Sequence, residues 1–376
     1  MLLSAICCRT SDYWLVGMRG GERVLEALCD IYPDAVIITH VADRRKLSGR
    51  ILRHEIRETF IARLPGANRH YQKYLAFMPL ALEMVDMAEF DLVISSESGP
   101  AKGIIPRPDA LHICYCHSPM RYIWDHFHIY RSRAGLLTRL VMPLIAHRLR
   151  IWDVSSAARV DAFVANSHFV AQRIEKYYRR GADVVAPPVA VQEFTPAPFD
   201  QIGDHYLLAG ELLGYKRPDL AVDAFTRSGR KLRVIGTGDQ MAALKRIAGP
   251  NIEFLGKVSF ERLKEEFARC RALIFPGEED FGIVPIEVMA AGRPVIAFGR
   301  GGVLDSVIAG KTGQFFYQQT VTAINDAVTA FEADLLDRMD PAAAILQAQQ
   351  FSTAEFAKKF KAAVESAADR TGLGRA

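Results

Sequence analysis

The chain has 376 residues, of which half are apolar and 24% are charged, and its formal net charge is +4. This length suits two domains of ordinary size, and the composition is that of a globular protein. No run approaches 18 uninterrupted apolar residues and the first residues lack a basic start, so we expect neither a transmembrane helix nor a signal peptide. The six cysteines lack metal-binding spacing, which favours reduced thiols in the cytoplasm.

The positive charge is concentrated in the N-terminal half. Residues 1–190 hold 25 Lys and Arg against 19 Asp and Glu, whereas the remainder holds 22 against 24. Two stretches, 44–73 and 126–150, carry nine and five basic residues with two and no acidic ones. Such clusters suit a phosphorylated substrate, an anionic membrane surface or nucleic acid, and they are also compatible with a solvated helix face.

Short apolar runs alternate with amphipathic segments along the first half, which indicates βαβ units and a parallel sheet. Residues 21–32 have apolar side chains at helical spacing and predict the first helix. The predicted strands are residues 2–8, 35–41, 91–97, 112–118 and 161–167.

The same alternation begins again after residue 200. Helices are predicted at 218–228 and 260–270, and strands at 205–212, 231–238, 251–258, 270–277 and 293–300. Residues 184–200 contain four prolines and are typical of an interdomain linker. We therefore predict an N-terminal domain at 1–190 and a C-terminal domain at 191–351. A final helix, about 352–370, has a pattern that also allows packing against the N-terminal domain.

Each half is predicted to be a doubly wound α/β domain, and ligands of such sheets bind beyond the carboxyl ends of the strands. The richest polar segment of this kind is 275–307. It contains Glu279 in a loop, Gly282 where backbone can approach a ligand, and Glu287 near the start of a helix. Amides at a helix start attract phosphate, and carboxylates accept hydrogen bonds from sugar hydroxyls. Taken alone, the two glutamates also fit an exposed helix start.

The run EDFGIVPIEVMAAGRPVIA, residues 279–297, resembles the E-x7-E signature of retaining family 4 glycosyltransferases of the GT-B fold. Blocks at 20–23, 166–174, 214–225 and 251–259 are also similar to that family. The block ICYCHSPMRYIWD at 113–125 resembles the bacterial mannosyltransferases of O-antigen and exopolysaccharide synthesis. The resemblance implies two Rossmann-like domains that face each other across a cleft.

The resemblance also implies roles for individual residues. Glu279 would bind the donor sugar, Glu287 the ribose and Lys216 the diphosphate, while His117 would face the sugar near the reacting carbon. His117, Glu279 and Lys216 are thus the expected catalytic residues. Arg121 and Asp125 could line the acceptor side, as could Trp124, which also fits the core. The remaining expected donor contacts come from Gly20, Gly21, Asp280, Phe281, Gly282 and Ile283.

One position departs from the family pattern. Glu211 stands where an arginine commonly shares the diphosphate with the lysine, and a carboxylate would repel phosphate. Glu211 could point away, or phosphate binding could be weakened. Our hypothesis is that Arg217, or a basic residue of the N-terminal domain, supplies the missing charge.

Motifs typical of dinucleotide, metal, P-loop and nucleic-acid sites are incomplete or absent. Gly236-Thr237-Gly238 lacks the third glycine of a dinucleotide site, and there is no D-x-D motif, zinc spacing or P-loop. Nucleic-acid motifs are absent as well. The missing metal motifs favour a reaction without a metal, and the family resemblance implies a hexosyltransferase that needs no cofactor and retains anomeric configuration.

By the same resemblance the donor is a nucleotide sugar, with GDP-mannose favoured, and the acceptor is a polyprenyl-diphosphate-linked saccharide. The basic clusters would hold the protein peripherally at the inner face of the cell membrane. A GT-B nucleotide-sugar epimerase and a non-catalytic nucleotide-sugar-binding protein remain alternatives.

Overall fold

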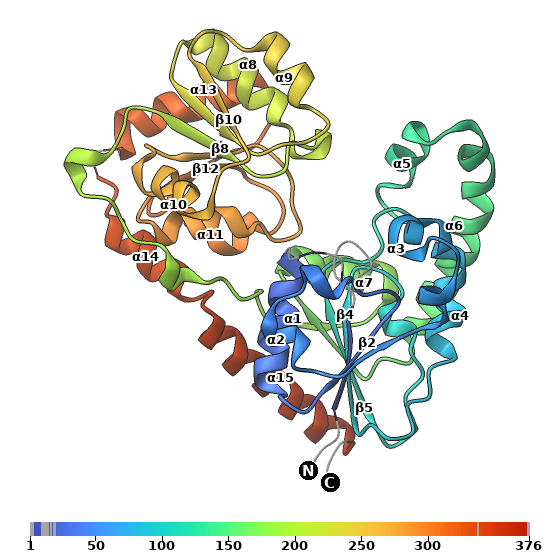
Figure 1. Cartoon of the computed structure of the whole chain (residues 1–376). Helices are drawn as coiled ribbons and strands as arrows, with labels where there is room; N and C mark the ends of the chain where they lie inside the picture. Colours follow the sequence, from blue (N-terminus) through green and yellow to red (C-terminus); the bar gives the residue numbers. More distant parts are fainter. Residues whose placement is uncertain (1–3, 9–14, 16, 18–19, 337, 374–376) are drawn as a thin grey trace. The chain divides into compact units, whose positions relative to one another are not determined.

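The computed structural model describes residues 4–8, 15, 17, 20–336 and 338–373. The chain divides into two compact units (Figure 1). Unit 1 comprises residues 1–188 and 356–376, and unit 2 comprises residues 189–355. The predicted division after residue 190 and the observed one after residue 188 both fall in the proline-containing segment.

Unit 1 is built on a seven-stranded parallel sheet in the order β3-β2-β1-β4-β5-β6-β7. Its longer helices are α1 (Gly20–Ile31), α5 (Phe127–Arg133), α6 (Leu136–Ala157), α7 (His168–Tyr178) and α15 (Thr353–Thr371). Short helices α2 (Gly49–Leu52), α3 (Ala67–His70) and α4 (Met78–Glu83) lie between β2 and β4 in the chain. The strands are β1 (Ser4–Cys8), β2 (Val36–Thr39), β3 (Ile56–Glu58), β4 (Leu92–Glu97), β5 (Leu111–Cys116), β6 (Ala162–Ala165) and β7 (Ala182–Val184).

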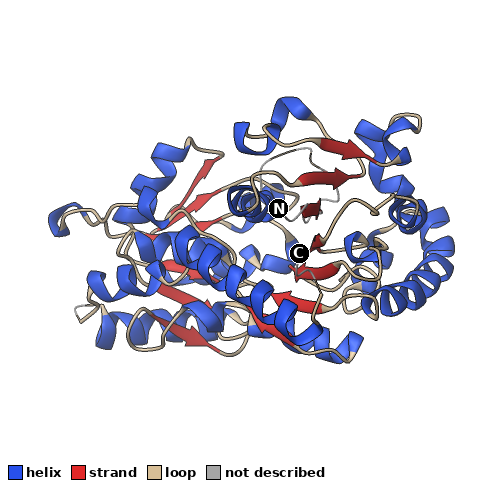
Figure 2. Cartoon of the chain, turned by 90° about the horizontal axis from the view of Figure 1, so that it is seen from below, coloured by secondary structure: helices blue, strands red, loops and turns tan. Residues whose placement is uncertain are grey.

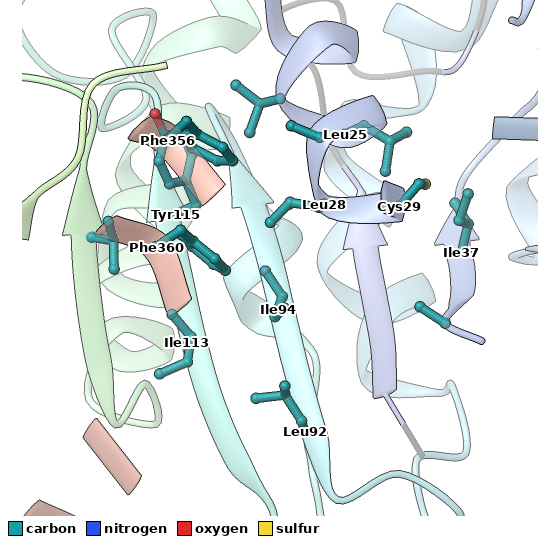
Figure 3. Close-up of a cluster of buried hydrophobic side chains, with 14 of the residues drawn as sticks. Leu25, Leu28, Cys29, Ile37, Leu92, Ile94, Ile113, Tyr115, Phe356 and Phe360 are labelled. Carbon is teal, nitrogen blue, oxygen red and sulfur yellow. The ribbon is translucent and has the colours of Figure 1, made fainter. Parts of the chain in front are cut away.

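The final helix α15 belongs to the core of unit 1. Phe356 and Phe360 pack edge-on against Tyr115 of β5, with ring centroids 5.7 and 6.1 Å away (Figure 3). Both phenylalanines are buried, in one cluster with leucines of α1 and isoleucines of β2, β4 and β5. Because this apolar face is covered by the sheet, the C-terminal end of the chain completes the N-terminal domain.

Unit 2 repeats the same topology with a six-stranded parallel sheet in the order β10-β9-β8-β11-β12-β13. Figure 2, which colours the whole chain by secondary structure, shows the strands in red with helices in blue around them. The strands are β8 (Tyr206–Ala209), β9 (Leu232–Ile235), β10 (Ile252–Gly256), β11 (Leu273–Phe275), β12 (Val295–Phe298) and β13 (Gly313–Phe316). The helices are α8 (Pro218–Ser228), α9 (Met241–Ile247), α10 (Phe260–Arg269), α11 (Ile283–Ala290), α12 (Val303–Ser306), α13 (Val321–Ala330) and α14 (Pro341–Gln349).

Three strands were not predicted from the sequence. β3, β7 and β13 have three or four residues each and lie at sheet edges, where one side of the strand has no partner. Such short strands leave no long apolar run, so periodicity alone does not reveal them. Within the described ranges, no helix is long and apolar enough to cross a lipid bilayer.

Candidate functional site

The site of unit 2 lies where its strand order reverses. β8 has β9 on one side and β11 on the other, so the segments that leave β8 and β11 run away from each other. Ligands of doubly wound sheets bind at this switch point, beyond the carboxyl ends of the strands. Lys216 follows β8 and Glu279 follows β11, which brings both residues to that edge of the sheet.

Lys216 and Glu279 form an ion pair at the switch point. The Lys216 Nζ lies 3.0 Å from a carboxylate oxygen of Glu279, and the side chains are 24% and 20% exposed. Glu211 lines the same small pocket as this pair. Burial lowers the pKa of Lys216, but the ion pair with Glu279 and the charge of Glu211 raise it, and the pKa lies above its ordinary value. Lys216 is therefore a protonated, ion-paired side chain beside the carboxylates of Glu279 and Glu211.

The backbone of the two loops is packed too tightly for larger residues. A Cβ atom on Gly277 would lie 2.7 Å from the Cα atom of Lys216. The N–H of Gly302 donates to the carbonyl oxygen of Glu279 at 2.9 Å, and a Cβ on Gly302 would lie 2.4 Å from the Asp280 carbonyl oxygen. These contacts fix the backbone on both sides of Glu279.

The Gly-Thr-Gly sequence after β9 has a packing role. Gly236 has a φ of +123°, and a Cβ atom there would lie 1.8 Å from the carbonyl oxygen of Gly210. A Cβ atom on Gly238 would lie 2.3 Å from the carbonyl oxygen of Leu212. These two glycines therefore allow the loop that carries Glu211 to lie directly against the end of β9.

The loop that contains Glu279 ends at Gly282, and helix α11 begins at the next residue, Ile283. Gly282 has a φ of +92°, a conformation that favours glycine, and it turns the chain into the helix. The amides of the first turn lack partners within the helix and carry its positive dipole end. Glu287 lies in the second turn and is half-buried, whereas Phe281 is buried against Phe351. This loop and helix start can bind a polar, negatively charged ligand.

Arg217 points to a different partner from Lys216. Its guanidinium donates to the Asp219 carboxylate from Nε at 3.1 and 3.3 Å and from Nη2 at 2.9 Å. The residue also has a φ of +53° at the start of α8. The pair uses Nε and one terminal nitrogen of the guanidinium, and the hypothesis that Arg217 replaces the missing arginine stays a prediction.

His117 of unit 1 follows β5 and is held from two sides. The Ser96 hydroxyl, at the end of neighbouring β4, lies 2.8 Å from its Nε2 atom. The side-chain amide of Asn166 donates to the His117 carbonyl oxygen at 3.0 Å. The imidazole is half-buried, and the Ser96 hydroxyl orients the ring while Asn166 anchors the backbone of His117. Gly20 and Gly21 form the first residues of α1 in the same unit.

Asp125 lies between two arginines. The Arg173 Nη2 atom lies 2.7 Å from one carboxylate oxygen of Asp125, and the Arg121 Nε atom lies 3.5 Å from the other. Arg173 also donates to the Ser118 hydroxyl at 2.6 Å, which ties the segment after His117 to α7. Asp125 therefore positions this segment.

Trp124 packs inside unit 1, in agreement with the core interpretation. Its indole N–H donates to the Asp153 carboxylate at 2.7 Å, and its ring stacks on Tyr177 at 4.7 Å. Asp153 is fully buried and forms an ion pair with Lys102, which is also fully buried. Trp124 is thus part of a buried polar network beneath the segment.

The structure brings Lys216, Glu279 and the Asp280–Ile283 loop together in unit 2, and it places Gly20, Gly21, His117, Arg121 and Asp125 in unit 1. Sequence reasoning missed Ser96, although its position at the end of a predicted strand was a usable signal. It also missed Arg173 and Asp219. Their partners lie on other elements or in an unremarkable turn, so no motif marks them.

The segment that contains Lys216 and Glu279 is similar to known glycosyltransferases. Residues 200–345 match the family model described as glycosyl transferases group 1. A D-inositol 3-phosphate glycosyltransferase of Streptomyces coelicolor is 28% identical over 57% of this chain and 58% of its own length. An alpha-1,3/1,6-mannosyltransferase, alg2 of Schizosaccharomyces pombe, is 24% identical over 78% of this chain and 65% of its own length. The chain thus spans less than two thirds of either relative.

Two solved structures share the fold over 97% of this chain. Sucrose-phosphate synthase from Thermosynechococcus elongatus has a TM-score of 0.74 at 17% identity, and 99% of it is covered. Anabaena Alr3699/HepE, solved in complex with UDP-glucose, has a TM-score of 0.69 at 15% identity, and all of it is covered. The prediction of two Rossmann-like domains of the GT-B type is confirmed, and residues 200–345 of the second unit are similar to glycosyl transferases group 1.

Proposed function

We propose that this protein transfers a sugar from a nucleotide diphosphate donor to an acceptor. The observation that carries the proposal is the Lys216–Glu279 ion pair at the switch point of unit 2, inside the segment that matches the glycosyltransferase model. In a donor complex the lysine would exchange its carboxylate partner for the diphosphate. Glu279 would then be available to accept hydrogen bonds from sugar hydroxyls.

The chemistry requires negative charge on the leaving phosphate to be stabilised as the glycosidic bond breaks. Preorganised cations and amides meet that need without reorganisation. Lys216 supplies the charge, the amides of 281–283 supply hydrogen bonds, and Glu287 binds the ribose. His117, held by Ser96, would face the sugar near the reacting carbon.

We further propose that the reaction retains anomeric configuration and needs no metal. Both properties rest on the resemblance of the 279–297 run to retaining family 4 enzymes. Turnover unchanged by a chelator, and a product with the anomeric configuration of the donor by NMR, are the expected results. Loss of turnover on chelation, restored by a divalent cation, would overturn metal independence.

GDP-mannose is the proposed donor, and a polyprenyl-diphosphate-linked saccharide of bacterial surface polysaccharide synthesis is the proposed acceptor. The 113–125 block and the similarity to a protein named as a mannosyltransferase support mannose. One structural neighbour was solved with UDP-glucose, which makes the uridine nucleotides the necessary comparison. The basic N-terminal unit would act at the inner face of the cell membrane, where such acceptors are found.

Thermal unfolding with GDP, UDP, ADP and their sugar conjugates tests the donor. A ligand at about 100 times its dissociation constant adds about 2.7 kcal/mol to stability. We expect stabilisation by GDP and GDP-mannose that is lost in Glu287→Ala and kept in Glu193→Ala, an exposed glutamate of the linker. Stabilisation by uridine nucleotides alone would overturn the GDP assignment, and no stabilisation by any nucleotide would overturn the donor site.

Glu211 supports a second candidate, a protein that binds the donor without turnover, because its carboxylate lines the pocket proposed for the diphosphate. Release of nucleoside diphosphate in the presence of lipid-linked saccharides separates the two functions. Binding without release favours the non-catalytic candidate. Formation of an epimeric nucleotide sugar without any acceptor would instead identify an epimerase.

A further inference from the structure

Helix α6 of unit 1 exposes leucines on the side that faces away from its core. Ala146, Leu149 and Asp153 lie on its buried side. On the other side Leu136, Leu137, Leu140 and Leu144 are 88%, 78%, 75% and 69% exposed, and Val141 is exposed as well. We call these five residues the leucine ridge. Figure 1 shows α6 beside α5, joined by the turn at which the ridge begins.

The ridge is a continuous stripe. At 3.6 residues per turn, its five side chains fall within an arc of about 140° around the helix axis. A helix on the surface of a globular protein normally presents polar residues over such an arc, because exposed apolar area is unfavourable in water. Contiguous exposed apolar surface of this kind marks an interaction site.

The surroundings of the ridge are positively charged. Residues 126–152 include no Asp or Glu, but they include five arginines and three histidines. Arg139 and Arg148 are exposed on α6 itself, and Arg131 of α5 is half-buried. An apolar stripe flanked by basic residues complements a surface that has an apolar interior beneath a negatively charged outer layer.

An anionic lipid surface fits these features better than a protein partner. The ridge is entirely aliphatic, whereas the energetically dominant residues of protein interfaces are Trp, Tyr and Arg, with Leu under-represented. A symmetric dimer through the ridge would bring the arginines of two copies together, and like charges repel. Helices that lie in the membrane interface combine a leucine-rich face with Lys or Arg at its polar margins.

The ridge is held rigidly to the segment that follows His117. Pro143 lacks an N–H, which leaves the carbonyl oxygen of Arg139 without its helical donor, and the Arg131 Nε donates to that oxygen at 3.3 Å. Arg150 donates to the Ile123 carbonyl oxygen at 2.6 Å, and its guanidinium lies 4.8 Å from the Phe127 ring centroid. The side chains that meet the membrane are thus fixed relative to the 113–125 block.

We propose that the leucine ridge inserts into the interface of an anionic bilayer, with Arg131, Arg139 and Arg148 facing the lipid phosphates. The ridge would then hold the residues near His117 at the depth where the sugar of a lipid-linked acceptor emerges. The insertion stands on the ridge alone, and only its purpose rests on the proposed function.

Flotation with vesicles tests the insertion. We compare phosphatidylcholine vesicles with vesicles that also contain phosphatidylglycerol, using the full chain and the variant Leu136→Asn/Leu140→Asn/Leu144→Asn. Because each leucine contributes its apolar area on insertion, we expect the triple variant to bind anionic vesicles more weakly by at least about tenfold. The matched control is Leu304→Asn/Leu346→Asn, two leucines of unit 2 that are 50% and 64% exposed, which should bind as the wild type does.

A second measurement reports the depth of the ridge directly. The indole of Leu140→Trp should shift its emission to the blue with anionic vesicles, and lipids brominated in their acyl chains should quench it. Arg139→Gln/Arg148→Gln should weaken binding at low salt but matter little at about 1 M salt, where the Debye length is about 3 Å. Unquenched indole, or equal vesicle binding by the triple variant and the wild type, would overturn the proposal.

Sedimentation and donor binding separate the remaining outcomes. If the triple variant changes the oligomeric state of the protein instead of its vesicle binding, the ridge joins two copies and the lipid proposal is wrong. Donor-dependent thermal stabilisation should be the same in the triple variant and the wild type, which also shows that the variant folds. If no nucleotide stabilises either protein but vesicle binding depends on the ridge, the proposed function fails and the membrane inference holds.

Discussion

Replacing Lys216 with methionine removes the cation at the switch point and keeps a side chain of similar length. In the structure the ammonium group lies 3.0 Å from Glu279 and is largely shielded from solvent. In the proposed donor complex its partner becomes the diphosphate. The variant therefore measures how much of the leaving-group charge this one residue stabilises.

Two independent estimates give the size of the effect. A unit charge about 4 Å from another contributes about 4 kcal/mol at an effective dielectric constant of about 20, which suits a partly shielded pair. Removal of one preorganised donor from an oxyanion site costs about 3–4 kcal/mol in measured enzymes. Since about 1.4 kcal/mol is a factor of ten, kcat/KM should fall by about 10²–10³ in Lys216→Met.

The assay is the initial rate of nucleoside diphosphate release from whichever donor stabilises the protein. Lys311→Met, an exposed lysine between α12 and β13, is the matched control and should behave as the wild type does. Most of the loss should appear in kcat if the lysine acts chiefly on the transition state, and in KM if it binds donor and transition state equally. An unchanged kcat/KM in Lys216→Met would refute the role of the ion pair.

Two further predictions concern stability and loop packing. Burial raises the pKa of Glu266, but the hydrogen bond with His205 and the charge of Arg233 lower it by more, to about 2 from an ordinary value of 4.5. Because the pKa is lower in the folded state, the Glu266 carboxylate contributes about 3 kcal/mol to the free energy of unfolding above pH 4.5, and this contribution is lost as the pH falls toward 2. In urea unfolding, the stability of Glu266→Gln should therefore depend less on pH in the acid range than that of the wild type. Gly302→Ala places a methyl group against the 280–281 backbone and should abolish donor-dependent stabilisation without loss of secondary structure by circular dichroism, whereas Gly181→Ala, where nothing lies within 4 Å of the added atom, should not.

Much of the fold was accessible from the sequence because parallel strands buried on both faces form near-continuous apolar runs. The predicted strand at 112–118 corresponds to β5 (Leu111–Cys116), and the predicted helix at 218–228 coincides with α8. Edge strands such as β3 and β13 lack that signal, because they are short and only partly buried. Their pairing depends on the neighbouring strand and not on their own composition.

Some residues of the candidate site could be found from the sequence, whereas the contacts that orient them could not. The pattern of apolar runs placed Glu279 in a loop after a predicted strand, whereas Lys216 and His117 were singled out by the resemblance of their blocks to the family. It did not show that Ser96 orients the His117 ring or that Asp219 holds Arg217, since both contacts depend on how side chains meet in space.

The sequence by itself determined the alternation of buried strands with helices, the division into two domains and the loop that carries Glu279. Only the tertiary structure decided that β8 and β11 are neighbours, and this adjacency brings Lys216 to Glu279. It also decided which side of α6 is buried. That helix is apolar around most of its circumference, so its periodicity could not distinguish the leucines that pack inside from those that face outward.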